Sequence, residues 1–228
     1  MTELIGMRLA ETASLTVALP AGVTHQAEAM SASRQQLFLA GRRLLALWLQ
    51  TRYGQDELPA MSYGEHGRPQ FNDPTLPDFN LSHSGDWLWL AIGAGPLGLD
   101  VEVRRPRRQL DKLMAHVLSA NEQDWVRLQP DPLSAFYALW TVREAVLKAS
   151  GRGLAGLGQV MVLPQTRQLL TASVPAGELQ QTAWAGLPLA LYQSTAMAVA
   201  PTVYCLAGGA LVETALPWSP SWTVSAAG

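Results

Sequence analysis

The sequence predicts an α+β fold, on three observations. Apolar residues recur at three- and four-residue spacing over 31–52 and over 131–150, which indicates two long amphipathic helices. Short alternating or continuous apolar runs, separated by Gly and Pro, indicate strands between and after these helices. A Gly85-Asp86 turn between two such runs indicates an antiparallel hairpin. With 228 residues, 48% of them hydrophobic, the chain can form one large domain or two of about 110 residues.

The N-terminal third is expected to contain a strand, a long helix and a long loop. Leu15–Leu19 is predicted as a strand that ends in a Pro-Ala-Gly turn. Ser31 or Ser33 can cap a helix that ends near Arg52. Its apolar stripe consists of Leu37, Leu44, Leu45, Trp48 and Leu49. Residues 53–78 are rich in Gly, Pro and Asp, which predicts a functional loop with one short strand or turn.

Two acids, Asp100 and Glu102, lie inside the apolar run Gly98–Val103, after the predicted hairpin strands Asn80–Ser84 and Trp87–Ile92. If Gly98–Val103 is a strand, both carboxylates lie on the same face. Neighbouring acids in a buried strand repel each other unless a cation binds between them. Mg²⁺ suits this position, because it binds through one or two carboxylates together with waters and substrate phosphates. An exposed strand edge is the competing explanation, which the flanking apolar residues disfavour.

The second half of the chain is expected to begin with three helices. The first is short and covers Asp111–Leu118. Ser119 and Glu122 match a capping box that starts the second helix. Asp131, followed by a proline, starts the third helix, which ends at Gly151.

The third helix carries Trp140, Glu144 and Lys148 on one face, at a spacing of four residues. Glu144 is the obvious third carboxylate for the strand acids, whereas Trp140 is expected in the core. Without those acids, a simple surface ion pair between Glu144 and Lys148 would be the preferred explanation. Beyond Gly153, alternating runs predict a small antiparallel sheet around Val160, Leu169, Leu189, Met197 and Val203.

The charge distribution excludes some classes of partner. A net charge of −2 argues against nucleic-acid binding by the chain as a whole. All basic residues except Arg8 and Arg167 lie between Arg34 and Arg152, so the middle of the chain is suited to anions. The single cysteine, Cys205, excludes an internal disulfide and fits a reducing cytosol. We see neither a signal peptide nor a membrane span, and we expect a cytoplasmic protein.

The polar residues of these elements describe one kind of chemistry. Three carboxylates, Lys148, scattered arginines and the Ser82-His83 pair suit Mg²⁺ and a polyphosphate ester. Phosphoryl transfer requires the neutralisation of phosphate charge and the positioning of an attacking oxygen. With no His-x-x-x-His pattern and no cysteine pair, zinc is disfavoured.

At this point the sequence resembles the 4′-phosphopantetheinyl transferases of the monomeric two-half type. Four blocks carry the resemblance, in order along the chain: Tyr63–Pro69 for the Gly-Lys/Arg-Pro loop, Phe79–Ser84 for Phe-Asn-x-Ser-His-Ser, Gly98–Glu102 for Gly-x-Asp-x-Glu, and Trp140–Lys148 for Trp-x-x-Lys-Glu-x-x-x-Lys, continued by Gly151–Leu154. Arg143 stands where the family usually has lysine, a change that keeps the charge. The last two blocks together are the specific ones.

The resemblance implies a pseudo-twofold fold in which each half has a small antiparallel sheet packed on a long helix. The halves would be residues 1–105 and 106–228, with the active site in the cleft between them. The implied reaction transfers 4′-phosphopantetheine from coenzyme A to a serine of an apo carrier protein, with adenosine 3′,5′-bisphosphate as by-product. Such carriers belong to fatty-acid, polyketide and nonribosomal-peptide synthases.

The resemblance also implies roles for individual residues. Asp100, Glu102 and Glu144 would hold Mg²⁺, with Mn²⁺ as the alternative metal. Glu144, directly or through a water, would accept the serine proton, and Lys148 would neutralise the pyrophosphate. The remaining coenzyme A contacts would come from Arg34, Arg42, Arg43, Arg68, Pro69, Ser82 and His83.

The resemblance further implies a monomer that binds its carrier transiently. We expect an acidic helix of the carrier to meet Leu113, Met114 and Val117, with the arginines of 104–108 close by. Two other functions stay open: a Mg²⁺-dependent nucleotide phosphohydrolase that uses the same acids, and a non-catalytic protein that binds coenzyme A or a carrier. Retention of all three acids and Lys148 argues against the non-catalytic protein.

Overall fold

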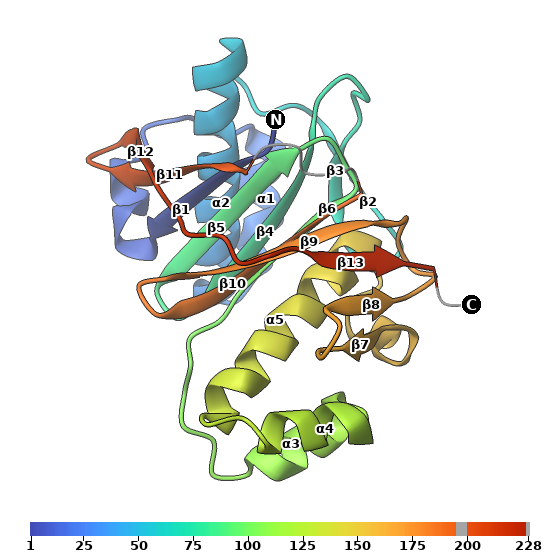
Figure 1. The fold of residues 1–228 in the computed structure, drawn as a ribbon. Helices are drawn as coiled ribbons and strands as arrows, with labels where there is room; N and C mark the ends of the chain where they lie inside the picture. The colour runs from blue at the N-terminus through green and yellow to red at the C-terminus, as the bar shows by residue number, and fades with distance from the viewer. Residues whose placement is uncertain (195–199, 227–228) are drawn as a thin grey trace.

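A computed structural model describes residues 1–194 and 200–226 and confirms the α+β fold class. Two mixed sheets lie face to face, and each carries a long helix on its outer face (Figure 1). The first sheet has the strand order β12-β11-β1-β5-β4, and the second has the order β6-β10-β9-β13-β8-β7. Within each sheet one pair of strands is parallel, β1 with β11 and β8 with β13, and the other pairs are antiparallel.

The first sheet packs against α2 (Ala32–Tyr53). Its strands are β1 (Glu3–Arg8), β4 (Asp78–Ser84), β5 (Trp87–Gly93), β11 (Thr202–Ala207) and β12 (Ala210–Thr214). Leu44, Leu45 and Leu49 of α2 are buried against the apolar side chains of this sheet. Ser31 precedes the helix, and Gly54 ends it in the left-handed conformation with φ 63°, which glycine adopts without steric cost. The predicted helix is therefore confirmed, as are Leu44, Leu45, Trp48 and Leu49 of its apolar stripe, whereas Leu37 lies outside this core and the Ser31 side chain makes no capping hydrogen bond.

The second sheet packs against α5 (Pro132–Ser150). Its strands are β6 (Leu97–Val101), β7 (Met161–Leu163), β8 (Gln168–Leu170), β9 (Gly177–Trp184), β10 (Leu187–Gln193) and β13 (Trp222–Ser225). Asp131 caps α5, because its carboxylate accepts a hydrogen bond from the Ser134 backbone N–H at 3.0 Å. Gly151 ends the helix with φ 69°. Both predicted ends of this helix are confirmed.

The remaining elements connect the layers. They are a 3₁₀ turn (Leu9–Ser14), α1 (Ala21–Glu28), β2 (Met61–Tyr63), β3 (Pro69–Phe71), α3 (Leu110–Val117), α4 (Ala120–Arg127) and a second 3₁₀ segment (Gly153–Gln159). The capping box of α4 forms as predicted, since the Glu122 carboxylate accepts from the Ser119 backbone N–H at 2.6 Å. In Figure 1, α3 and α4 lie beside the N-terminal end of α5.

Three details of the sequence prediction are wrong or fall elsewhere. Leu15–Leu19 is not a strand; the first strand lies earlier, at Glu3–Arg8, where it pairs with β5 and β11. The loop over 53–78 contains two short strands rather than one, and β2 and β3 pair only with each other. Met197, placed in a late strand run, lies outside the described residues.

The two sheets exchange strands across the middle of the chain. β6 comes from the first half and pairs with β10 in the second sheet. β11 comes from the second half and pairs with β1 in the first sheet. A core between the sheets, which includes Trp89, Leu99 and Leu191, joins them. The division of the chain at residues 105 and 106 stays a prediction.

Side chains of β4 bridge to the backbone of β6 at every second residue. Leu97 N–H donates to Asp78, Leu99 N–H to Asn80, Val101 N–H to Ser82, and Val103 N–H to Ser84, at 2.9 to 3.2 Å. These N–H groups belong to an edge strand and would otherwise lack a partner. We call this row of four bonds the β4–β6 ladder. It joins the edge of one sheet to the edge of the other.

The helices do not meet the requirement for a membrane span. Within the described residues, none is long and apolar enough to cross a bilayer.

The approach of β6 to α5 leads to a stability prediction. A Cβ at Gly98 would lie 2.0 Å from the Ala145 carbonyl oxygen and 2.7 Å from the Ala149 nitrogen. Backbone atoms of a packed helix cannot yield cheaply, so Gly98→Ala should lower the free energy of unfolding by about 3 kcal/mol or more. Urea denaturation measures this loss.

The matched control is Gly22→Ala in α1, where a Cβ meets nothing within 4 Å. It should leave stability unchanged or raise it slightly, because alanine favours the helix. Equal stability of Gly98→Ala and the wild type would contradict the packing described here.

Candidate active site

The site begins at the middle of the β4–β6 ladder, where Ser82, Asp100 and Lys148 meet. Lys148 Nζ donates to Asp100 Oδ1 at 2.6 Å and to Ser82 Oγ at 2.7 Å. Ser82 Oγ also donates to Asp100 Oδ1 at 3.0 Å. These residues come from β4, β6 and α5, and Asp100 is buried. The structure therefore brings together three of the predicted site residues.

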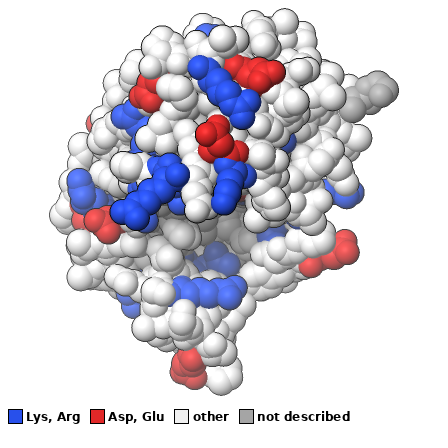
Figure 2. Space-filling view, turned by 90° about the horizontal axis from the view of Figure 1, so that it is seen from below, with Lys and Arg blue, Asp and Glu red and all other residues white. Residues whose placement is uncertain are grey.

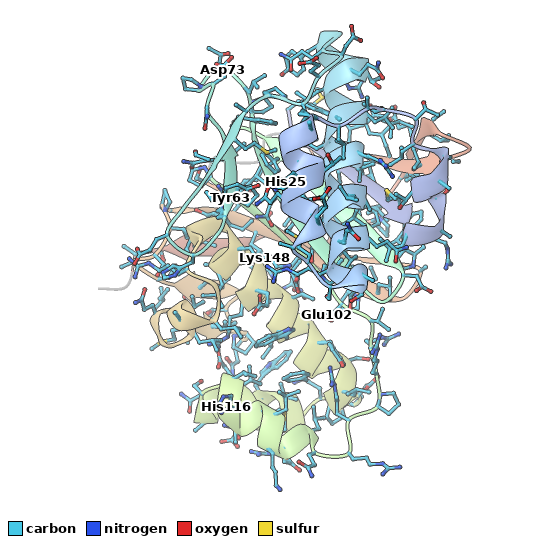
Figure 3. The ribbon with its side chains drawn as sticks, turned by 180° about the vertical axis from the view of Figure 1, so that it is seen from behind. His25, Tyr63, Asp73, Glu102, His116 and Lys148 are labelled. Atoms are coloured by element: carbon cyan, nitrogen blue, oxygen red, sulfur yellow. The ribbon has the colours of Figure 1, made fainter. Side chains whose placement is uncertain are left out.

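Alternation along β6 places Glu102 beside Asp100, as predicted. Leu99 and Val101 point into the core between the sheets, whereas Asp100 and Glu102 point to the opposite face, towards α5. Ser84 Oγ donates to Glu102 Oε2 at 2.8 Å, and Trp140 Nε1 donates to Glu102 Oε1 at 3.3 Å. Figure 3 shows Glu102 and Lys148 on the same side of the molecule along α5.

Glu144 lies near both strand acids, and burial together with their negative charges raises its pKa. Burial, and then the negative charge of Asp100, raises the pKa of Glu144 to about 7, with Glu102 contributing in the same direction. Lys148 opposes the shift. Glu144 Oε1 is buried without a hydrogen-bond partner among the described residues, as is Asp100 Oδ2. One carboxylate oxygen of each of these two acids is therefore buried without a hydrogen-bond donor.

Two further groups respond to this cluster. Burial raises the pKa of Asp100, although the contact with Lys148 acts against the shift. Partial burial, and then the charge of Lys148, lowers the pKa of His83, whereas Glu102 raises it. The His83 imidazole therefore gives up its proton more readily than a free imidazole does.

The donor set of the cluster fits a hard cation. Carboxylate oxygens are the ligands that Mg²⁺ prefers, and the free oxygens of Asp100 and Glu144 have no donor to displace. Within residues 1–194 and 200–226, however, no three His, Cys, Asp or Glu side chains already stand as a ligand set. Lys148 holds one Asp100 oxygen, and Ser84 and Trp140 hold those of Glu102. Cation binding would thus require Lys148 to shift.

Arg68 and Pro69 lie next to Lys148, at a cavity of about 210 Å³. The Arg68 guanidinium is largely used within the protein. It donates to Asp78 Oδ2 at 2.6 Å and to the carbonyl oxygens of Leu97 and Lys148, both at 3.1 Å. Arg68 therefore ties the 64–69 loop to β4, β6 and the end of α5.

The arginines of α2 are further from this cluster. Arg42 is buried; its guanidinium lies 4.7 Å above the Phe38 ring, and Nη2 donates to the Tyr63 hydroxyl at 3.4 Å. Within the described residues no carboxylate pairs with Arg42, and its Nε is buried without a partner. Arg34 is exposed and Arg43 half-buried, and no contact joins either one to Lys148 or the acids. Figure 2 shows basic side chains around a hollow on the face seen from below.

Sequence reasoning missed the roles of Ser84, Trp140 and Glu122. Trp140 packs against the core as expected, and in addition its indole N–H donates to Glu102. Glu122 was expected to cap α4, with a contact to the active site as the alternative; it caps the helix, and it is also fully buried and pairs with Arg143. The four-residue spacing of Trp140, Glu144 and Lys148 was the available signal for Trp140. For Glu122, the available signal was an arginine, Arg143, inside the apolar pattern of the third helix, where a buried guanidinium needs an acid partner.

The expected carrier-binding surface on α3 needs a correction. Met114 and Val117 are buried in the core beneath α3, and Leu113 is partly buried against the same core. These residues form the inward face of the helix and cannot present an apolar surface to a partner. The arginines of 104–108 are exposed.

Comparison with known proteins shows the family to which the chain belongs. Residues 96–200 match the 4′-phosphopantetheinyl transferase superfamily. The chain is 38% identical over 147 residues to the 4′-phosphopantetheinyl transferase AcpT of Escherichia coli O157:H7, a match that covers 63% of the chain and 71% of AcpT. The chain belongs to the 4′-phosphopantetheinyl transferase superfamily.

Two other relatives match over a smaller share of their length. The 4′-phosphopantetheinyl transferase of Bacillus subtilis is 35% identical over 123 residues, which cover 51% of the chain and 53% of that protein. The uncharacterized protein YieE of E. coli K12 is 37% identical over 147 residues, which cover 63% of the chain and 59% of YieE. The chain thus spans about half to three fifths of the length of several curated relatives that it matches.

The ion pair at the centre of the site leads to a double-mutant prediction. Lys148→Met leaves the buried Asp100 carboxylate without its cation, and should lower stability by about 3 kcal/mol at pH 7. Asp100→Asn should also destabilise the protein, because Lys148 loses its counterion. The double variant should lose less than the sum of both single losses, since the pair is removed together. Additive losses in urea titrations would contradict a direct pairing.

The shifted pKa of Glu144 predicts how stability depends on pH. In the folded, metal-free protein this carboxyl binds its proton more tightly than in the unfolded chain, where its pKa is about 4.5. The free energy of unfolding should therefore fall as pH rises from about 4.5 to about 7, by at most about 3 kcal/mol from this group. In Glu144→Gln this part of the fall should vanish, whereas the exposed control Glu213→Gln should follow the wild type. Parallel pH profiles for all three proteins, measured with a chelator present, would contradict the shift.

Proposed function

We propose that this protein transfers 4′-phosphopantetheine from coenzyme A to a serine of an apo carrier protein in a Mg²⁺-dependent reaction. One observation carries the proposal. Lys148 of α5 contacts Asp100 of β6 and Ser82 of β4, and Glu144 lies one helical turn away in the field of Asp100. Each of these residues lies in a sequence block that resembles a motif of the family, and the chain belongs to that superfamily.

Mg²⁺, or Mn²⁺ in its place, would be held by Asp100, Glu102 and Glu144. When bound, the metal supplies positive charge that neutralises the pyrophosphate of coenzyme A. The unpartnered oxygens of Asp100 and Glu144 support this assignment.

Glu144 would accept the proton of the carrier serine, directly or through a water. A carboxylate within reach of the attacking hydroxyl can act as a general base. Lys148 would leave Asp100 when the substrate binds and neutralise the pyrophosphate while the bond to the leaving phosphate breaks. Ser82 and His83 would donate hydrogen bonds to phosphate oxygens.

The other coenzyme A contacts would lie around this centre. Arg68 and Pro69 would line the adenine end at the 210 Å³ cavity, with the backbone of that loop in contact, because the Arg68 side chain is already engaged. Arg42 is a buried cation without a counterion, which supports a role in binding a phosphate. Arg43 and Arg34 would extend this basic surface.

We further propose that the carrier is an acidic acyl or peptidyl carrier protein that binds transiently to a monomer in the cytoplasm. The exposed arginines of 104–108 support an acidic partner. The fatty-acid, polyketide or nonribosomal-peptide pathway follows from the carrier that is served.

Mass spectrometry of carriers tests the function. After incubation with coenzyme A and Mg²⁺, an apo carrier should gain about 340 Da, the mass of a phosphopantetheinyl group. Asp100→Asn and Glu144→Gln should each lower the transfer rate by at least about 100-fold, because each removes a charged group at the reacting phosphate. Thermal melts should show that both variants are folded.

The outcomes separate the competing functions. Nucleotide breakdown without any gain in carrier mass would instead support a phosphohydrolase. Binding of coenzyme A with neither reaction, across several carriers, would support a non-catalytic binding protein.

A further inference from the structure

The carboxylate of Glu102 is held by two donors that the proposed reaction does not use. Ser84 Oγ donates to one oxygen at 2.8 Å, and Trp140 Nε1 donates to the other at 3.3 Å. Each oxygen therefore has one protein partner, and the two partners come from opposite sides, β4 and α5. A glutamate has three rotatable bonds, and without such contacts a half-buried one samples several rotamers.

The contacts of the Ser84 hydroxyl fix the direction of its proton. Its oxygen accepts a hydrogen bond from the Val103 backbone N–H at 2.9 Å, as the last contact of the β4–β6 ladder. A hydroxyl has a single proton, and with the oxygen engaged as an acceptor that proton points to Glu102. Ser82 repeats the arrangement two residues earlier, where it accepts from Val101 N–H and donates to Asp100.

Trp140 is fixed on the other side. Its ring stacks on Phe136, with centroids 6.4 Å apart and an interplanar angle of 14°. An indole N–H only donates, so this contact is the same in every protonation state of the site. Trp140 precedes Glu144 by four residues on the same face of α5, and so the helix that carries one acid also orients another.

The two donors are neutral, and this distinguishes Glu102 from Asp100. Lys148 neutralises Asp100 with a charge, whereas an alcohol and an indole orient Glu102 and leave its negative charge in place. A fixed, uncompensated carboxylate next to Asp100 and Glu144 is what a divalent cation requires.

We propose that Ser84 and Trp140 are positioning residues, which hold the Glu102 carboxylate in the orientation that completes the metal site. The inference rests on the proposed function only in taking Asp100, Glu102 and Glu144 as the metal ligands. Loss of a partner that orients a metal-binding side chain typically lowers metal affinity 10- to 100-fold.

The experiment measures Mn²⁺ binding by the isolated protein, without coenzyme A or carrier, from the electron paramagnetic resonance of free Mn²⁺. Ser84→Ala and Trp140→Phe each remove one donor, and each should raise the dissociation constant of Mn²⁺ about tenfold. Ser84→Thr keeps the hydroxyl and should stay within about twofold of the wild type. The matched control is Trp125→Phe in α4, a tryptophan against the same core, which should bind Mn²⁺ as the wild type does.

Transfer assays supply a second readout, the Mg²⁺ concentration for half-maximal rate, which would not change if Ser84 and Trp140 only stabilised the fold. In Ser84→Ala and Trp140→Phe the Mg²⁺ concentration for half-maximal rate should rise about tenfold, while kcat at saturating Mg²⁺ stays within about threefold of the wild type. If Ser84→Ala does not fold, Trp140→Phe decides, since phenylalanine preserves the stacking on Phe136.

Two results would overturn the positioning role, and a third would separate it from the proposed transfer activity. Unchanged Mn²⁺ affinity in both Ser84→Ala and Trp140→Phe would overturn the positioning role, as would a wild type that binds no Mn²⁺. A wild type that binds Mn²⁺ and loses affinity in these variants, yet modifies no carrier, would support the positioning role while the proposed transfer fails.

Discussion

The β4–β6 ladder is the contact on which the site depends. Side chains at alternate positions of β4 satisfy the backbone N–H groups of β6, so the edges of two sheets are joined without direct strand pairing. Direct pairing would place the strands about 4.8 Å apart and leave no side chains between them. The ladder instead inserts Ser82 and Ser84 between the strands, where each can donate to an acid of β6. The same contacts that join the sheets therefore orient the acids.

The ladder places negative charges together, and α5 determines how they are balanced. Gly98 lets α5 approach β6 closely enough for Lys148 to reach Asp100. One lysine cannot neutralise three acids. Burial, and then the negative charge of Asp100, raises the pKa of Glu144 to about 7. A protein selected for stability alone would have little reason to keep this excess, because buried like charges are costly. The excess is consistent with the proposed metal site, because a bound divalent cation would offset it.

Local signals in the sequence were sufficient for much of the fold and for the central acids. The helix caps at Asp131 and Ser119 and the hairpin turn at Gly85 depend on neighbouring residues, and period-two alternation correctly put Asp100 and Glu102 on one face. The failures concern contacts between distant segments. Leu15–Leu19 has a strand pattern, but β1 takes the place beside β5, and nothing local reveals that pairing. Likewise, no pattern in 79–84 indicates that Ser84 donates to Glu102, because that contact depends on how two sheets meet.

Arg143 shows how the resemblance to a family can understate a difference. A change from the usual lysine to arginine keeps the charge, but the planar guanidinium makes contacts that an ammonium on a shorter stem cannot combine. Arg143 pairs with the buried Glu122 and donates to the Val160 carbonyl at 3.0 Å and to the Leu157 carbonyl at 3.4 Å. Glu122 in turn accepts from the Val162 backbone N–H at 3.0 Å. This network fastens α4, the second 3₁₀ segment and β7 to the residue next to Glu144. A lysine at this position would keep the ion pair and release part of the 3₁₀ segment, so the arginine contributes to the packing beside Glu144.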